Sequence, residues 1–494
     1  MVRSLGSSLV VGLAVLLSAC GGDEKTARDH RPVVLVGFDG MEWRVAAPLI
    51  RAGRMPHLKA LIERGSAGYL YTEKPALSPV CWTSIATGMR KGEHGIENFL
   101  DPTGNPYTSS QRRTKALWNI ASDYGLQTLC VGWWVTWPAE EIAGFMVAPY
   151  STAGQNAFNW KGSVRKDLPD QTWPRALFDE LVPIVEDVRA SDRLKTVASS
   201  YFAIPASIPL GDAEKKLVAQ TLWSVEADEI YLRVVQAMQR REGVKPDLTM
   251  AYFGCTDVVS HRFWRYMEPG AFKYAIPAEH VAEFKDAIAK SYEQADRILG
   301  EVLAGAPADA NVIVCSDHGF HAEFLDQPHP EGLSGHHLDG PPGIVVMAGP
   351  DVAPGFGKDA ILEGRGSIED AGFIYDVAPV VLTLLGVPTG RDMQSYDGGP
   401  LAKRMLQKAL REASRGYNVR SHDEGFRKAA TSGPRVDASV VEDANRALQQ
   451  LGYLGIDPGD TDERTRPPTK KPVVDPPKDP AAGQNDPKGK NEKE

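Results

Sequence analysis

Continuous runs of apolar residues, several of which end in aspartate, mark the predicted strands of this chain. The runs cover residues 33–39, 248–257 and 311–317, and a helical pattern through Ile62 follows the first of them. Strands without a polar side indicate burial on both faces, and their alternation with helices is typical of a parallel sheet. We therefore predict an α/β fold with a central, mostly parallel sheet and helices on both faces.

Residues 150–247 interrupt this pattern. They include a long amphipathic helical pattern over 212–241 and several aromatic residues, namely Trp160, Trp173, Tyr201 and Phe202. Either these helices are scaffold that packs on the sheet, or they form a cap whose aromatic residues shape a leaving-group pocket. We predict one catalytic domain over 32–415 with this region inserted, followed by a helical segment over 416–457.

Both ends of the chain differ from the predicted domain. Arg3 precedes an apolar run over 9–17, and the Leu-Ser-Ala-Cys sequence at 17–20 resembles a bacterial lipobox. This run is shorter than the roughly twenty residues that span a bilayer, which makes a transmembrane helix the weaker interpretation. We expect a signal peptide over 1–19, a lipid-anchored Cys20 and a tether over 20–31, with simple cleavage after Ala19 as the alternative.

These features place the protein in the cell envelope, either facing the periplasm or anchored to the outer membrane, with the lipid on Cys20 as its contact with the membrane. Residues 458–494 are rich in proline and charge, and we predict a disordered tail there because they cannot form a core.

The composition excludes several other classes. In the 494 residues, 42% are hydrophobic and 24% charged, which excludes a collagen-like, wholly disordered or multi-span membrane protein. The net charge of −9 argues against a nucleic-acid partner, because such proteins present a basic surface to phosphates. The cysteines beyond Cys20 form no Cys-x-x-Cys motif, so we expect buried free thiols.

Aspartates at the ends of the apolar runs are the first candidate functional residues. Asp39, Asp257 and Asp317 would meet at the carboxyl edge of a parallel sheet, where such folds bind ligands. Taken singly, each aspartate is equally well explained as a turn former or a helix cap.

Histidines near these aspartates favour a metal site. His261 follows Asp257 by four residues, His318 follows Asp317 directly, and His336 and His337 follow Gly335. A set of carboxylates and imidazoles can form two adjacent metal sites with mixed oxygen and nitrogen ligands. This mixture suits Zn²⁺, with manganese and iron as alternatives.

Ser78 is the candidate nucleophile. It precedes Pro79 at a predicted helix start, where we expect Ser78 as the N-cap and Pro79 as the first helical residue. Backbone N–H groups at such a start favour a phosphate or sulfate group, although a plain N-cap explains the same pattern.

An ordered series of motifs resembles one enzyme family. In chain order the motifs are Phe38-Asp39-Gly40, Ser78 three residues after Pro75, Ser84-Ile85-Ala86-Thr87-Gly88, His94-Gly95-Ile96, Asp257 with His261, Asp317-His318-Gly319, and a late histidine. Over about residues 32–390 this series resembles the type I phosphodiesterase/nucleotide pyrophosphatase family of the alkaline phosphatase superfamily. The resemblance implies an alkaline-phosphatase-like fold with an inserted cap subdomain.

The resemblance also implies roles for the candidate ligands. Asp39, Asp317, His318 and the nucleophile would bind one zinc ion, and Asp257, His261 and a late histidine the other. The family's Gly-x-His pattern selects His337, while extra residues at 340–342 keep His336 as an alternative.

Three further assignments follow from the resemblance. Counting back from Thr87-Gly88 places the nucleophile at Ser78, where the family has threonine, with Thr83 as the alternative hydroxyl. Asn98 lies one residue before the family's phosphate-contacting asparagine. His57 and His94 correspond to no metal ligand of the family.

The functional hypothesis is a phosphodiesterase that uses two divalent metal ions and forms a covalent phosphoseryl intermediate on Ser78. Its substrate would be a small molecule, lipid or glycan that contains a phosphodiester. A phosphomonoesterase, a phosphonate hydrolase and a transferase of phosphorylated head groups are alternatives within the superfamily. A surface lipoprotein that only binds ligands is the non-enzymatic alternative.

Overall fold

The computed structural model describes residues 25–149, 169–193, 195–196 and 211–426. Cys20, the predicted signal peptide and the predicted tail over 458–494 lie outside these described residues, so their assignments stay predictions. Of the predicted helical segment over 416–457, the described part up to residue 426 contains a short strand and turns.

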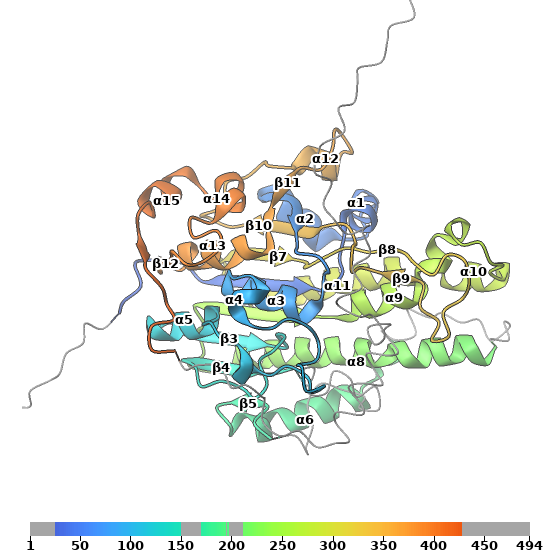
Figure 1. Ribbon diagram of the computed structural model, residues 1–494, viewed down its shortest axis with the longest axis horizontal. Helices are drawn as coiled ribbons and strands as arrows, with labels where there is room; N and C mark the ends of the chain where they lie inside the picture. The colour runs from blue at the N-terminus through green and yellow to red at the C-terminus, as the bar shows by residue number, and fades with distance from the viewer. Residues whose placement is uncertain (1–24, 150–168, 194, 197–210, 427–494) are drawn as a thin grey trace, which may run out of the picture. The chain divides into compact units, whose positions relative to one another are not determined.

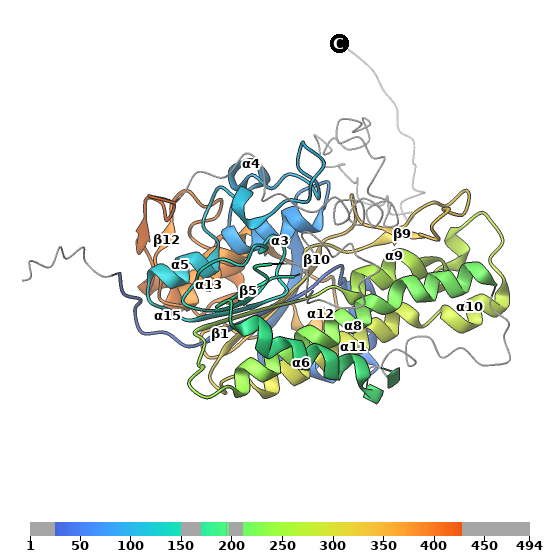
Figure 2. The ribbon, with the colours of Figure 1, turned by 90° about the horizontal axis from the view of Figure 1, so that it is seen from below.

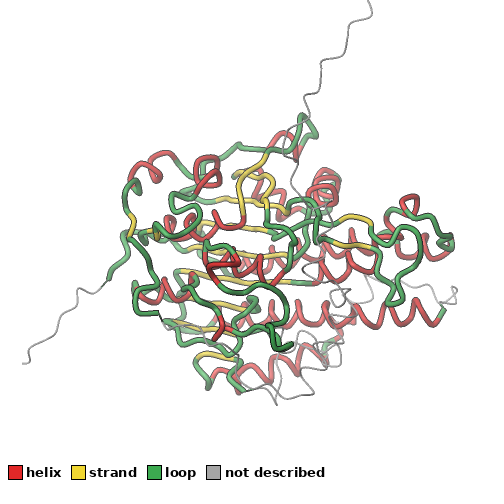
Figure 3. The backbone as a smooth tube through the Cα atoms, viewed as in Figure 1, coloured by secondary structure: helices red, strands yellow, loops and turns green. Residues whose placement is uncertain are grey.

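One nine-stranded sheet forms the centre of the described chain (Figures 1 and 3). Its strands, in spatial order, are β11 (Asp370–Phe373), β2 (Ser66–Tyr71), β10 (Gly343–Ala348), β7 (Asn311–Cys315), β1 (Val33–Phe38), β6 (Leu248–Phe253), β3 (Thr128–Val131), β4 (Gly144–Val147) and β5 (Thr172–Trp173). β10 and β5 run opposite to the other strands, and the central strands β7, β1, β6 and β3 are parallel. The predicted fold class is confirmed.

Helices cover both faces of this sheet (Figure 2). One face carries α1 (Trp43–Arg51), α2 (Pro56–Arg64), α6 (Leu177–Ala190), α8 (Asp212–Arg240), α9 (Cys255–Met267), α11 (Ala287–Ala304) and α12 (Lys358–Leu362). The other face carries α3 (Ser78–Thr87), α5 (Leu117–Asp123), α13 (Val377–Leu384) and α14 (Gly399–Met405). Strand β1 explains why both faces are apolar, because Val34 and Val36 join one core while Val33 and Leu35 join the other.

Short elements complete the described chain. They are the helices α4 (Lys91–His94), α10 (Ala278–Phe284) and α15 (Lys408–Ala413), the 3₁₀ turns at Ser109–Gln111, Pro269–Ala271 and Ile374–Asp376, and two small sheets. One small sheet pairs β12 (Thr389–Gly390) with β13 (Asn418–Val419), and the other pairs β8 (His321–Ala322) with β9 (Gly335–His336).

The region that interrupts the strand pattern contributes to the sheet and to its cover. β5 adds an edge strand next to β4. The buried sides of α6 and α8 belong to the core that contains Val34 and Val36 of β1. The described part of this region therefore packs on the sheet. The choice between scaffold and cap stays a prediction, because the aromatic residues Trp160, Tyr201 and Phe202 lie outside the described residues.

Two further observations concern the whole described chain. Cys81, Cys130, Cys255 and Cys315 are buried and form no disulfide among the described residues, as predicted. None of the described helices combines the length and the apolarity needed to cross a membrane.

Candidate metal centre

Asp39, Asp317 and His318, which we call the first ligand group, meet beyond the carboxyl ends of two neighbouring strands. β1 and β7 are parallel, with Gly37 opposite Cys315, so Asp39 and Asp317 follow their strands at the same level. His318 Nε2 lies 3.3 Å from Asp39 Oδ1 and 3.3 Å from Asp317 Oδ2. All three side chains are buried.

Asp257, His261 and His337 form the second ligand group. Asp257 and His261 lie one turn apart on α9, so they share one face of this helix. Asp257 Oδ1 is 3.6 Å from His261 Nε2 and 3.5 Å from His337 Nε2. His337 directly follows β9 and is fully buried.

The two ligand groups form one centre. The rings of His318 and His337 are stacked, with centroids 3.7 Å apart and an angle of 11° between their planes. Thr256, next to Asp257, donates a hydrogen bond from its hydroxyl to the backbone carbonyl of Asp39. Residues from the ends of β1, β7, α9 and β9 are thereby brought together, although they lie as far apart as positions 39 and 337.

The donor atoms of this centre fit divalent metal ions. Asp39 Oδ1, Asp257 Oδ1, Asp317 Oδ2 and His318 Nε2 are buried and have no hydrogen-bond partner within the described chain. Buried polar atoms are almost always paired, so four such atoms in one place need an explanation. These atoms, together with the nearby imidazoles, match the mixed oxygen and nitrogen ligands that zinc accepts.

Hydrogen bonds orient the ligands toward the centre. His261 Nδ1 donates to the Gly335 carbonyl at 2.9 Å, and His337 Nδ1 donates to the Ala76 carbonyl at 3.0 Å. To donate in this way, each neutral ring carries its proton on Nδ1, which leaves Nε2 as the nitrogen that can bind a metal.

The electrostatics of the centre also favour a cation. Burial and the neighbouring Asp39 raise the pKa of Asp257 and of Asp317 well above the ordinary value for a carboxyl group. Burial lowers the pKa of His261 and His337 well below the ordinary histidine value and that of His318 to about 4. The imidazoles are therefore neutral, and a bound cation would stabilise the ionised carboxylates.

Two side chains that the sequence motifs did not point to, Trp82 and Tyr252, hold Asp39 in place. Trp82 Nε1 and the Tyr252 hydroxyl both donate to Asp39 Oδ2, at 3.0 Å and 2.7 Å. They direct Oδ1 toward His318. In the sequence, Tyr252 could have been noticed as a side chain with a hydroxyl group inside an otherwise apolar strand, because such a hydroxyl usually has a hydrogen-bond partner.

Replacing Tyr252 with phenylalanine is expected to weaken metal binding at the first ligand group by about tenfold, because one of the two donors on Asp39 is lost. Competition with a chelator measures this affinity. Tyr124→Phe is the control, since Tyr124 is also buried but packs against His422. Equal metal affinities in Tyr252→Phe and the wild type would show that Trp82 alone positions Asp39.

Ser78 is the first residue of α3 and not its N-cap, which corrects the prediction. Leu77 is the N-cap, and its carbonyl accepts from the amides of both Val80 and Cys81 at 2.9 Å. Because Pro79 has no N–H and the Val80 and Cys81 amides bond to Leu77, the first turn presents few free donors, and an anion site made by its backbone amides stays a prediction.

Hydrogen bonds on both sides of Ser78 attach its segment to the metal centre. Ala76, two residues before, accepts from His337, and Trp82, one turn after, donates to Asp39. Ser78 is 3% exposed. It therefore lies between an attachment to the second ligand group and an attachment to the first.

The alternative residues are placed differently. The Thr83 hydroxyl donates to the carbonyl of Pro79 at 2.6 Å, within its own helix. His336 pairs across β8–β9 with His321 and is not part of either ligand group. His94 lies between Ser84 and the amide of Ile96, both within 3.1 Å of its ring nitrogens.

Asn98 follows α4 and is partly buried. Its side-chain oxygen accepts from the amide of Phe99 at 2.8 Å, and the Phe99 ring packs on Trp134, which in turn packs on Tyr252. These aromatic contacts connect the loop that contains Asn98 to Tyr252, which donates a hydrogen bond to Asp39. A contact between Asn98 and a phosphate stays a prediction.

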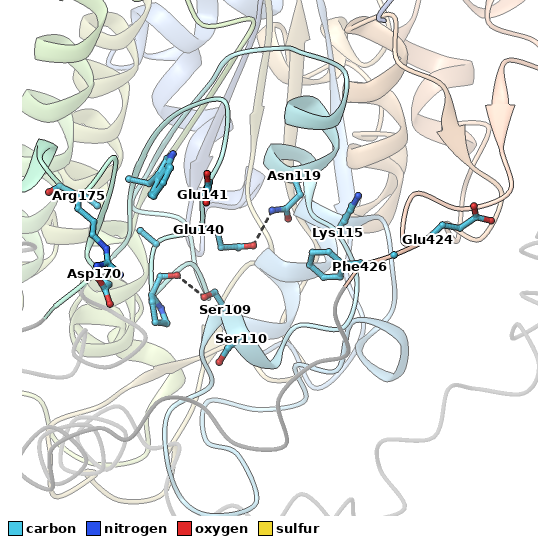
Figure 4. Close-up of a pocket in the computed structure, with 15 residues that line it drawn as sticks. Ser109, Ser110, Lys115, Asn119, Glu140, Glu141, Asp170, Arg175, Glu424 and Phe426 are labelled. Carbon is cyan, nitrogen blue, oxygen red and sulfur yellow. Dashed lines mark hydrogen bonds and ion pairs between the residues drawn. The ribbon is translucent and has the colours of Figure 1, made fainter. Parts of the chain in front are cut away.

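A cavity of about 590 Å³ lies elsewhere, between β5 and residues 424–426 (Figure 4). Its lining includes Asn119 and Glu140 but no member of either ligand group. Glu140 accepts hydrogen bonds from Arg112, Trp118 and Asn119. This satisfied buried carboxylate contrasts with the unpartnered carboxylate oxygens of the metal centre.

Comparisons with known proteins give one family match. The family model described as type I phosphodiesterase / nucleotide pyrophosphatase matches residues 33–358, a range that contains both ligand groups and Ser78.

Individual curated relatives match only a short part of the chain. A 2,3-bisphosphoglycerate-independent phosphoglycerate mutase from Synechocystis sp. is 29% identical over 137 residues, which are 26% of this chain and 24% of that protein. The chain thus spans about a quarter of the length of this relative.

The similar solved structures include two hydrolases. Human ectonucleotide pyrophosphatase/phosphodiesterase 5 is 13% identical with a TM-score of 0.40, covering 72% of this chain and 95% of the human one. Phosphonoacetate hydrolase from Sinorhizobium meliloti 1021, in complex with phosphonoformate, is 20% identical with a TM-score of 0.35, covering 59% and 57%.

Proposed function

The chain belongs to the type I phosphodiesterase/nucleotide pyrophosphatase family, and from this membership we propose that it hydrolyses phosphodiesters with two divalent metal ions and Ser78 as nucleophile. The predicted family is thereby confirmed. The metal ions, the covalent intermediate and the substrate are parts of the proposal.

One observation supports this proposal most strongly. The two ligand groups adjoin through the stacked His318 and His337 rings, and one oxygen of each of their three carboxylates is buried without a hydrogen-bond partner in the described chain. The segment around Ser78 is hydrogen-bonded to both groups. A nucleophile held next to two metal-binding groups suits phosphoryl transfer.

The proposed reaction has two steps. The Ser78 oxygen bonds to phosphorus and loses its proton, while the bond to the leaving alcohol breaks and that alcohol takes up a proton. Water then bonds to phosphorus, the bond to Ser78 breaks, and the serine hydroxyl is restored. Divalent ions held by the two ligand groups would supply positive charge that acidifies the Ser78 hydroxyl and neutralises the phosphoryl oxygens.

The residues of the chain have distinct tasks in this proposal. Trp82 and Tyr252 orient Asp39, the Ala76 carbonyl orients His337, and α3 presents Ser78. Zinc is the proposed metal because the ligands mix carboxylate and imidazole, with manganese or iron as alternatives.

The summed charge of the metal centre does not distinguish a diester substrate from a monoester substrate. Three aspartates and two divalent cations would sum to about +1, which suits a diester monoanion. The fully buried Arg262 stands next to His261 and contributes to lowering the pKa of that histidine. Because this guanidinium also acts on the centre, the preference for a diester rests on the family and not on the charge.

Parallel assays with an aryl phosphodiester, an aryl phosphomonoester, an aryl phosphonate and an aryl sulfate test the proposed activity. We expect the highest kcat/KM for the diester. A higher value for the monoester or phosphonate would reject the diesterase assignment. Metal binding without turnover of any substrate would favour the ligand-binding lipoprotein instead.

Location completes the proposal. A lipid-anchored Cys20 and a position in the cell envelope would expose this enzyme to nucleotide, lipid or glycan phosphodiesters outside the cytoplasm.

A further inference from the structure

The amino end of α9 is capped by a carboxylate from a different helix. Asp228 lies in the middle of α8, and its two oxygens accept hydrogen bonds from the backbone amides of Gly254 and Cys255, at 2.9 Å and 3.2 Å. Gly254 is the N-cap of α9 and has no side chain to do this. The first amides of a helix lack partners within the helix, so Asp228 supplies the missing acceptors.

The first turn of α9 determines how the two ligand groups are spaced. Asp257, the third residue of α9, belongs to the second ligand group. The preceding Thr256 donates to the Asp39 carbonyl, and a Cβ on Gly40 would lie 3.2 Å from the Asp257 Cα. The first turn of α9 therefore fits between Asp228 on one side and the Asp39–Gly40 backbone on the other.

From these contacts we propose that Asp228 is a positioning residue for the second ligand group and holds Asp257 and His261 at their distance from the first group. This inference rests on the proposed function, because it assigns metal ions to both groups. Within the described chain Asp228 makes hydrogen bonds to the Gly254 and Cys255 amides, and we expect it to act through this backbone of α9.

A second contact from α8 reaches the same place. The Ser224 hydroxyl, one turn before Asp228, donates to the Thr221 carbonyl at 2.7 Å, and its oxygen lies 3.4 Å from Cys255 Sγ. Both side chains are buried, with Asp228 6% and Ser224 2% exposed. Helix α8 lies in the region that interrupts the strand pattern, and it contacts the start of α9 as well as covering the sheet.

Asp228→Asn tests this proposal. An amide has nearly the shape of the carboxylate, but its NH₂ group cannot accept from the second backbone amide. We expect one of the two metal equivalents to bind about tenfold more weakly, as is typical for loss of an orienting contact, while the other keeps its affinity. Competition with a chelator measures both affinities, with zinc as the probe.

The chain offers a matched control in Asp296→Asn. Asp296 is a buried aspartate on α11 whose two oxygens accept from the amides of His57 and Leu58, at 3.1 Å and 2.7 Å, near the start of α2. α2 carries no member of either ligand group. We expect Asp296→Asn to lower thermal stability without a selective change in metal affinity.

Hydrogen exchange in the metal-free protein provides a second measurement. Asp228→Asn is expected to speed exchange of the amides at 254–257 more than elsewhere in the described chain. Two equivalents bound to Asp228→Asn with wild-type affinity, or an equal loss in Asp296→Asn, would overturn the positioning role. If the wild-type protein bound no metal, both the positioning role of Asp228 and the proposed two-metal function would be overturned.

Discussion

Replacing Ser78 with alanine is expected to lower kcat for phosphodiester hydrolysis by a factor on the order of 10³ or more, because no other hydroxyl occupies its place. Ser78 lies between the Ala76 and Trp82 contacts to the two ligand groups. Since the ligand groups remain intact, the variant should still bind metal, and its thermal stability should change little. Steady-state kinetics with the aryl phosphodiester measures the loss.

Thr83→Ala is the control for this experiment. The Thr83 hydroxyl already donates within α3, so its removal should leave kcat within about tenfold of the wild type while costing about 1 kcal/mol of stability. Full hydrolysis by Ser78→Ala, or a large loss in Thr83→Ala alone, would exchange the roles of the two residues. Mass spectrometry of the wild type during turnover should find Ser78 carrying the phosphoryl group together with the alcohol that stays esterified to it.

Removal of metal is expected to abolish hydrolysis and to lower the thermal stability of the protein. Without cations, burial and, after it, the neighbouring Asp39 raise the pKa of Asp257 and of Asp317 well above the ordinary carboxyl value. At a free metal concentration about 1,000 times Kd, binding stabilises the folded state by about 4 kcal/mol, which chelation would remove. Scanning calorimetry and elemental analysis before and after chelation measure both effects.

The same treatment of Ser78→Ala separates stability from catalysis. This variant should lose stability on chelation as the wild type does, although it has no activity to lose. Zinc added back should restore both properties of the wild type, and manganese tests the alternative metal. Full activity in a chelated protein that contains no metal would reject the metal-dependent mechanism.

The strands that carry the ligands could be predicted closely from the sequence. The apolar run at 33–39 became β1 (Val33–Phe38), and the run at 311–317 became β7 (Asn311–Cys315). Such runs are informative because a strand buried on both faces has no polar alternation to confuse with a surface helix. Asp39 and Asp317 end these runs, so their position at the carboxyl edge followed from the pattern.

The start of α3 could not be predicted to the residue. Ser78 before Pro79 has the local signature of a cap, yet Leu77 is the residue whose carbonyl receives the first amides. Helix boundaries depend on which backbone groups pair, and a side-chain pattern indicates that pairing only to within a residue or two.

The choice between His336 and His337 also needed the structure. His336 lies in β9 and pairs with His321, whereas His337 follows the strand and reaches the Ala76 carbonyl and Asp257. The His336 ring also lies near the centre, 5.6 Å from the His261 ring, but of these two histidines it is His337 whose ring nitrogen lies 3.5 Å from Asp257 Oδ1. Two neighbouring imidazoles this close together cannot be told apart by spacing along the chain.

The sequence by itself therefore determined the sheet that brings the strand ends together and the residue types at those ends, because burial and strand periodicity are local properties. The tertiary structure decided how these residues are held. Trp82, Tyr252 and Asp228 come from α3, β6 and α8, and their hydrogen bonds to Asp39 and to the start of α9 join segments between 26 and 213 residues apart. Such contacts leave no periodic signal in the chain, since they depend on the packing of whole elements against one another.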